Sequence, residues 1–107
     1  MTWDEETAAR VRRILSKRPH VVEKKMIGGL SFIIRGKLCC GVNRLGLLVR
    51  IGPEVRQKIL EQPHVRPMKL GGRMVSSFVR VDPEAYRSDA ALAKWVEIGV
   101  RYALAAS

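Results

Sequence analysis

The 107-residue sequence predicts an α+β domain in which helices at both ends of the chain pack on an antiparallel β-sheet. Three observations lead to this class. Residues 3–17 and the stretch after Ser88 carry hydrophobic side chains at helical spacing. Short apolar segments separated by turn residues lie between them. These segments follow one another too closely for parallel crossovers, so we expect a meander of about five strands.

The two terminal helices are predicted from their hydrophobic spacing and from residues that favour helix ends. The first spans residues 3–17, where Thr2 and Glu5 match a capping box. The last begins after Ser88 or Asp89, either of which can cap it, and runs to about residue 105. Both helices have one apolar side, so we expect both to pack on the sheet.

Turn residues divide the middle of the chain into strands. We expect strands at residues 21–26, 30–35, 38–42, 47–51 and 74–81. A short helix is predicted at 53–62, before the last strand, because Pro53 suits a first helical position and Pro63 ends the pattern. Residues 64–73 are predicted to be a loop, because they hold a proline, two adjacent glycines and three basic residues.

Alternation along the strands separates two faces of the sheet. The face predicted to meet the helices carries Leu30, Phe32, Ile34, Leu47, Val49, Ile51, Val79 and Val81. The opposite face is expected to show Ser31, Ile33, Arg35, Leu48, Arg50, Ser76, Phe78 and Arg80. A mixture of aliphatic, aromatic and arginine side chains is typical of interface cores, and an ordinary exposed sheet face with scattered hydrophobic residues is the alternative.

Length and composition limit the class of protein. A chain of this length with 47% hydrophobic residues predicts one domain over residues 1–107. No apolar run approaches the roughly 18 residues of a membrane span, and the acidic start lacks the apolar run of a secretory signal. The two cysteines are adjacent and make no disulfide framework, so we expect a cytoplasmic protein.

The positive charge is concentrated in the middle of the chain. The formal net charge is +10, and residues 35–80 hold ten basic and two acidic side chains, a net charge of +8. A basic surface of this kind favours a polyanionic partner, and it predicts salt-sensitive binding of nucleic acid as one alternative.

The residues that often carry chemistry form no catalytic or metal-binding motif. On a regular strand Cys39 points outward and Cys40 toward the core, and we expect both to be packing residues, with redox sensing and metal binding as alternatives. His20 and His64 each follow a proline and match no known arrangement of a catalytic triad or zinc site. We therefore predict no catalytic residue, no metal and no cofactor.

Several stretches, taken in order, resemble the TfoX/Sxy N-terminal domain family of bacterial competence regulators. They are residues 23–30 (EKKMIGGL), 39–42 (CCGV), 49–54 (VRIGPE), 63–68 (PHVRPM), 72–73 (GR), 78–79 (FV) and 81–83 (VDP), with a closing Trp95-Val96 and Gly99. The resemblance implies a curved antiparallel sheet flanked by helices and a non-enzymatic role in regulation. Longer members carry a second, helical domain and act as transcriptional co-activators, so a chain ending at Ser107 is expected to be the N-terminal domain alone. Residues 74–77 (MVSS) depart from the Pro-Met-Lys-Gly that members often have there.

The leading interpretation is a non-catalytic regulatory or adaptor domain that binds a protein partner. The expected contact residues are Arg50, Arg66, Lys69, Arg73 and Arg80, with Phe78 as an apolar anchor. One alternative is direct, low-specificity nucleic-acid binding through the basic residues of 35–80. Another is an enzyme acting on an anionic small molecule, which requires a pocket that joins Cys39, His64 and arginines. A homodimer formed through a free strand edge is also compatible with the sequence.

Overall fold

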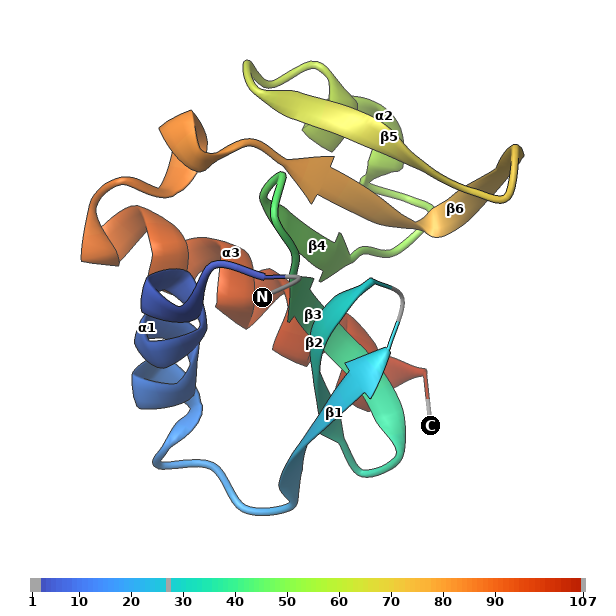
Figure 1. Cartoon of the computed structure of the whole chain (residues 1–107). Coiled ribbons are helices and arrows are strands. Elements are labelled where there is room, and N and C mark those ends of the chain that lie inside the picture. Colours follow the sequence, from blue (N-terminus) through green and yellow to red (C-terminus); the bar gives the residue numbers. More distant parts are fainter. Residues whose placement is uncertain (1–2, 27, 107) are drawn as a thin grey trace.

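The computed structural model describes residues 3–26 and 28–106 of the chain, and within them six strands form one antiparallel sheet (Figure 1). The elements are, in chain order, α1 (Glu5–Leu15), β1 (Val21–Met26), β2 (Gly29–Ile34), β3 (Lys37–Val42), β4 (Leu47–Arg50), α2 (Arg56–Leu60), β5 (Val65–Leu70), β6 (Arg73–Val81), the 3-10 helix η1 (Pro83–Tyr86) and α3 (Asp89–Ala105). The strands lie in the order β1-β2-β3-β4-β6-β5. The predicted α+β class is confirmed, with a sixth strand that the sequence did not predict.

Strand β5 replaces the loop predicted at residues 64–73. It pairs only with β6 and lies at an edge of the sheet, where a proline is tolerated because no second neighbour needs its N–H. Pro67 stands beside a register shift, between Pro67 and Met68. Gly71 and Gly72 form the turn into β6 with φ of 58° and 81°, values that glycine adopts without a steric cost. The two glycines therefore form only the turn at the end of a hairpin, whereas the sequence predicted a loop over the whole of residues 64–73.

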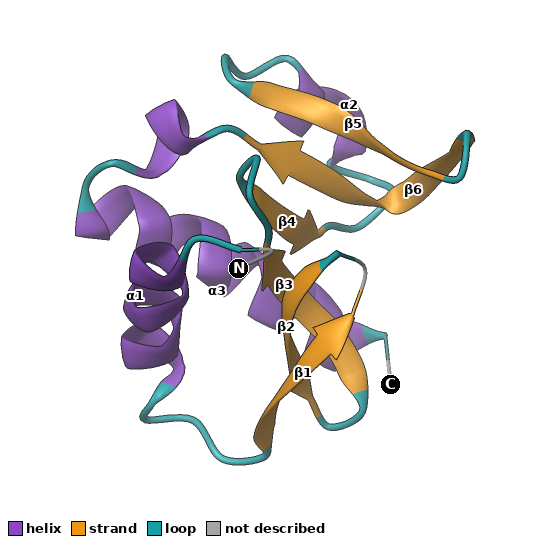
Figure 2. Cartoon of the chain, in the orientation of Figure 1, coloured by secondary structure: helices purple, strands orange, loops and turns teal. Residues whose placement is uncertain are grey.

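The core lies between the sheet and the two terminal helices. All eight residues predicted to face the helices are buried: Leu30, Phe32, Ile34, Leu47, Val49, Ile51, Val79 and Val81. Helix α3 packs on β3 and β4, and α1 packs against α3 on the same side of the sheet (Figure 2). The short helix α2 contacts β5 and buries Ile59. The alternation in the sequence thus identified the helix-covered face correctly.

The close approach of α3 to β3 depends on a glycine and a β-bulge. Phe32 pairs with Cys40 and Ile33 with Leu38, so Cys39 is an extra residue between two paired positions. A side chain at Gly99 of α3 would overlap the carbonyl oxygen of Cys39. Both cysteines are fully buried. The prediction that Cys39 points outward is therefore wrong, because the bulge breaks the alternation on which it rested.

Helices α1 and α2 are shorter than the sequence predicted, whereas α3 has the predicted extent and one of its expected caps. Helix α1 has Asp4 at its N-cap position, and the Thr7 hydroxyl donates a hydrogen bond to the Asp4 carboxylate at 2.6 Å. The expected capping box involved Thr2, which lies outside the described residues. Ser88 caps α3, because its side chain accepts a hydrogen bond from the Ala91 N–H at 3.1 Å. Among residues 3–26 and 28–106, no helix is both long enough and apolar enough to span a membrane.

Candidate functional site

Four of the predicted contact residues lie on the outer face of the sheet, by which we mean the side turned away from α1 and α3: Arg50, Arg66, Phe78 and Arg80. Strand pairing aligns one row of residues across this face: Lys24, Ser31, Gly41, Leu48, Arg80 and Arg66. The centre of the row is small or apolar, whereas both of its ends are cationic. Along this row, basic rims therefore lie on either side of an uncharged middle.

A second hydrophobic cluster lies on the outer face. Leu48, Met68 and Phe78 are buried together, with Leu38 and Val75 packed against them. Met68 comes from β5, the strand that the sequence did not predict. Phe78 is only 7% exposed, because Met68 of β5 packs against it, so it is not displayed at the surface as the strand alternation predicted. Leu48, also expected to be displayed, is buried for the same reason.

Arg50 is engaged within the sheet. Its Nε donates a hydrogen bond to the carbonyl oxygen of Leu38 at 2.6 Å. Its guanidinium lies 4.8 Å from the ring centroid of Phe78, the residue paired with it on β6. Burial lowers the pKa of the Arg50 side chain below its ordinary value. Arg50 and Phe78 are therefore one internal contact that supports the sheet.

Arg66 and Arg80 face each other across β5 and β6. Arg66 donates from Nε to the Asp82 carboxylate at 2.9 Å. Arg80 is half-buried and has neither an ion pair nor a side-chain hydrogen bond among the described residues. Two like charges directly opposite each other on neighbouring strands destabilise a sheet. The pair is therefore a place where an anionic group from outside would be favourable.

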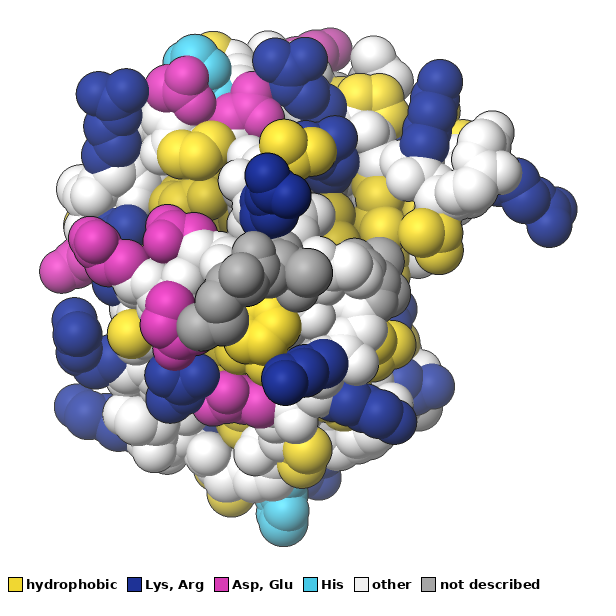
Figure 3. Space-filling model, viewed as in Figure 1, with side chains coloured by type: hydrophobic (Ala, Val, Ile, Leu, Met, Phe, Trp, Pro, Cys, Tyr) yellow, Lys and Arg dark blue, Asp and Glu magenta, His cyan; other side chains and the backbone are white. Residues whose placement is uncertain are grey.

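The end of the β5–β6 hairpin, which we call the hairpin tip (residues 69–74), carries the remaining contact residues. Lys69 and Arg73 are exposed, and neither forms an ion pair within the described part of the chain. Leu70 is 52% and Met74 51% exposed beside them, two apolar side chains that the sequence analysis did not select. The hairpin projects from the body of the protein, and cationic and apolar side chains stand together on this projection (Figure 3).

The thiols are enclosed and separated from the surface histidines. The sulfur of Cys39 lies 4.0 Å from the carbonyl oxygen of Val96 in α3. A hydrogen bond with Cys39, together with burial, raises the pKa of the Cys40 thiol well above its ordinary value. His64, in contrast, is exposed just before β5. The structure therefore does not bring Cys39 and His64 into one surface pocket, as the enzyme hypothesis required.

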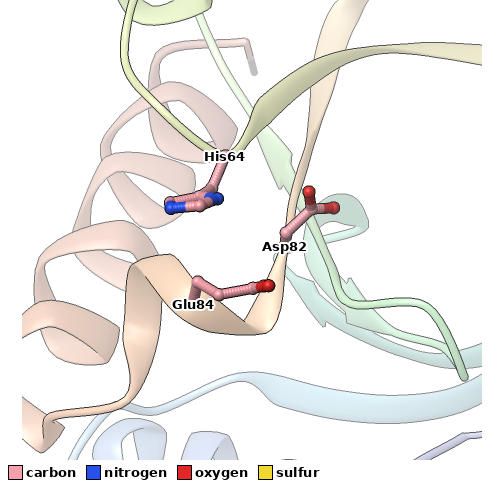
Figure 4. A group of neighbouring side chains, drawn as sticks. All are labelled: His64, Asp82 and Glu84. Atoms are coloured by element: carbon pink, nitrogen blue, oxygen red, sulfur yellow. The ribbon is translucent and has the colours of Figure 1, made fainter.

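One group of potential metal ligands was not predicted. A ring nitrogen of His64 and carboxylate oxygens of Asp82 and Glu84 lie within 4.8 Å of one another (Figure 4). The sequence separates His64 from the two acidic residues, and the pairing of Val65 with Val81 brings them together. No local motif could have signalled this group, because its geometry depends on the register of β5 and β6.

Both edges of the sheet are formed by strands with one neighbour each, β1 and β5. All side chains of β1 but Val21 are exposed, and they include Lys24 and Lys25. Charged residues on an edge strand, lysine above all, oppose pairing with a second sheet. A homodimer through a strand edge remains a prediction.

Comparison with known proteins gives one match. A family model described as the TfoX N-terminal domain matches residues 13–103. Neither the curated proteins nor the solved structures gave a match. The matched range includes all six strands, both basic rims of the outer face and the hairpin tip.

Proposed function

The chain belongs to the TfoX N-terminal domain family, and on that premise we propose that it is a regulatory adaptor domain that docks an acidic protein partner. The family consists of competence-related regulatory domains and is not a known enzyme family. We assign the docking surface to Arg66, Arg80 and the hairpin tip, without the Arg50–Phe78 contact. This role needs no catalytic residue and no cofactor.

The observation that carries the proposal is the set of cations on the β5–β6 hairpin. Arg80 is half-buried without an anionic partner in the described chain, and Lys69 and Arg73 extend from the tip on the neighbouring strands. Partly desolvated arginines at the centre of an interface, with exposed positive charge at its rim, are typical of surfaces that bind carboxylates. An acidic segment placed there would relieve the repulsion between Arg66 and Arg80.

The apolar residues of the tip favour a protein over nucleic acid. Leu70 and Met74 are both about half exposed, and each is paired with one of the tip cations, Leu70 with Arg73 and Met74 with Lys69. Apolar side chains of this size fit the hydrophobic side of an amphipathic acidic segment. Binding to single-stranded nucleic acid relies on exposed aromatic side chains, and none of the aromatic residues in the described chain is exposed. Direct nucleic-acid binding is therefore the second candidate, supported by the charge alone.

The test compares two charge reversals of equal size. The first variant is Arg73→Glu with Arg80→Glu on the docking surface, and the control is Arg13→Glu in α1 with Lys17→Glu just after it, both at exposed positions. The full chain captures a partner from a bacterial lysate, and the affinity of the purified partner is then measured by titration calorimetry. We expect the first variant to bind about 30-fold more weakly or worse, since an interface hot spot contributes about 2 kcal/mol or more. The control should bind as the wild type does.

Equal binding by both variants would contradict the docking surface. A parallel mobility-shift assay with short duplex DNA separates the second candidate from the first. One outcome would favour nucleic acid over a protein partner: the wild type captures no protein but binds DNA. Its affinity for DNA should then fall by orders of magnitude between about 50 and 200 mM salt. Circular dichroism of each variant checks that the fold is retained.

A further inference from the structure

We propose that His64, Asp82 and Glu84 bind a divalent transition-metal ion of the Zn²⁺ type at the base of the β5–β6 hairpin. One nitrogen and two carboxylate oxygens lie within 4.8 Å of one another and surround a common space (Figure 4). Zn²⁺ takes histidine nitrogen and carboxylate oxygen at about 2.0–2.2 Å, which places ligand atoms about 3–4 Å apart. Ion binding would require small rotations of these side chains to close the remaining distance.

The backbone brings the three ligands together before any ion binds. His64 precedes β5, Asp82 follows β6 and Glu84 belongs to η1. The Asp82 N–H donates to the His64 carbonyl oxygen at 2.8 Å, and the Ala85 N–H donates to the Asp82 carbonyl oxygen at 3.0 Å. The first bond ties the two segments together, and the second holds the turn that carries Asp82 and Glu84. Binding would not have to overcome the entropy of assembling the site from a flexible loop.

A second histidine in the chain provides an internal comparison. His20 and His64 each follow a proline, are exposed and adopt left-handed backbone conformations, with φ of 65° and 66°. Only His64 has two carboxylates within reach in the described chain. A left-handed turn after proline therefore does not by itself produce the ligand group. The difference between the two positions is the chemistry that surrounds His64.

The neighbouring Arg66 leaves the Asp82 carboxylate able to bind a metal. Arg66 Nε donates to Oδ2 of Asp82, so Oδ1 remains available to an ion. Carboxylates that bind metals commonly accept such a hydrogen bond from an outer residue, which orients them. With neutral His64, the ligand set carries two negative charges, which suits a divalent cation. The arginine thus acts as a support for the site.

The ligand types select the metal. Ca²⁺ prefers six to eight oxygen ligands, and Mg²⁺ keeps several waters in an octahedral shell of oxygen. A set of one imidazole and two carboxylates instead suits Zn²⁺, Co²⁺ or Ni²⁺. Three protein ligands leave at least one coordination position open for water or for a group from another molecule. The ion would join the start of β5 to the end of β6.

The test titrates the full chain with Zn²⁺ alone, and with Mg²⁺ alone, by calorimetry and by thermal unfolding. We expect one Zn²⁺ per chain, a rise in melting temperature with Zn²⁺ and no such rise with Mg²⁺. His64→Ala and Glu84→Gln should each weaken binding about tenfold or more, a loss typical of damaged metal sites. His20→Ala is the matched control and should bind as the wild type does. Both variant positions are exposed, so both substitutions leave the core intact.

The histidine resonances separate this site from adventitious binding by the buried thiols. In an NMR titration of the wild type, Zn²⁺ should shift the ring signals of His64 and leave those of His20 unchanged. Zn²⁺ binding of wild-type strength in both His64→Ala and Glu84→Gln would overturn the proposal. The absence of saturable binding, or equal shifts at the two histidines, would overturn it as well.

Discussion

Removal of Arg50 should destabilise the protein, although Arg50 was selected from the sequence as a docking residue. In Arg50→Ala, the Leu38 carbonyl oxygen loses a charged donor at 2.6 Å and the Phe78 ring loses a cation at 4.8 Å. A hydrogen bond from a charged group contributes about 1.5–3 kcal/mol and an exposed cation–π contact about 0.5–1 kcal/mol. Since Arg50 is partly exposed, we expect a loss near the lower end of their sum, about 2 kcal/mol.

Urea unfolding followed by circular dichroism measures this loss. Arg80→Ala is the matched control, because Arg80 is also half-buried on the outer face but forms no ion pair or side-chain hydrogen bond in the described chain. The free energy of unfolding of this variant should differ from that of the wild type by no more than about 0.5 kcal/mol. A double-mutant cycle with Phe78→Leu isolates the stacking contact. The cycle should give a coupling of about 0.5–1 kcal/mol between the two positions.

Two results would refute this account of Arg50. The first is an Arg50→Ala variant as stable as Arg80→Ala, which would mean that the hydrogen bond and the stacking contact contribute nothing measurable. The second is a coupling of zero in the cycle, which would mean that Phe78 is only a neighbour. Either result would return Arg50 to the set of residues available to a partner.

Three further predictions concern the core. Gly99→Ala should lower the free energy of unfolding by about 1–2 kcal/mol in urea, because overlap with a strand carbonyl outweighs a gain of about 1 kcal/mol in helix propensity. At exposed Lys94 of the same helix, the Ala variant should instead be more stable than the Gly variant. If alanine were more stable than glycine at both positions, the packing argument would be contradicted. Cys39 and Cys40 should react with a thiol reagent only as the protein unfolds, because both are buried and the pKa of Cys40 is raised; rapid labelling under native conditions would show otherwise. Burial raises the pKa of Tyr86 from 10.0 to about 12, so above pH 10 the unfolded state releases the phenol proton while the folded state keeps it. Stability should therefore fall between about pH 10 and 12, by up to about 1.4 kcal/mol per pH unit, and Tyr86→Phe should lose less over this range; equal losses would exclude Tyr86 as the cause.

Local periodicity explains why the helix-covered side of the sheet was predictable. Strand residues two positions apart share a face of the sheet. The apolar pairs Phe32 with Ile34 and Val79 with Val81 therefore indicate which face is apolar. The cap at Ser88 was predictable for a similar reason, since it depends on a hydrogen bond to a residue three positions away. Such features involve only neighbours along the chain.

The predictions that the structure contradicts all depend on pairing between residues that are distant in the sequence. Pro67 and the two glycines after Leu70 carry the local signals of a loop, yet β5 forms because β6 offers it a partner at the edge of the sheet. Cys39 faces the core because a bulge opposite β2 adds one residue to β3. Phe78 is buried because Met68 reaches it from β5. None of these pairings has a signature within one segment of the chain.

The sequence by itself determined the α+β class, the apolar face of the sheet, the excess of positive charge and the resemblance to a regulatory family. These properties follow from composition and from spacing along one segment, so they need no knowledge of which strands meet. The tertiary structure alone decided which cations remain available. It engages Arg50 with Phe78 while it leaves Arg80 without a partner in the described chain. It also gathers His64 with Asp82 and Glu84, because the register of β5 and β6 determines which distant side chains become neighbours.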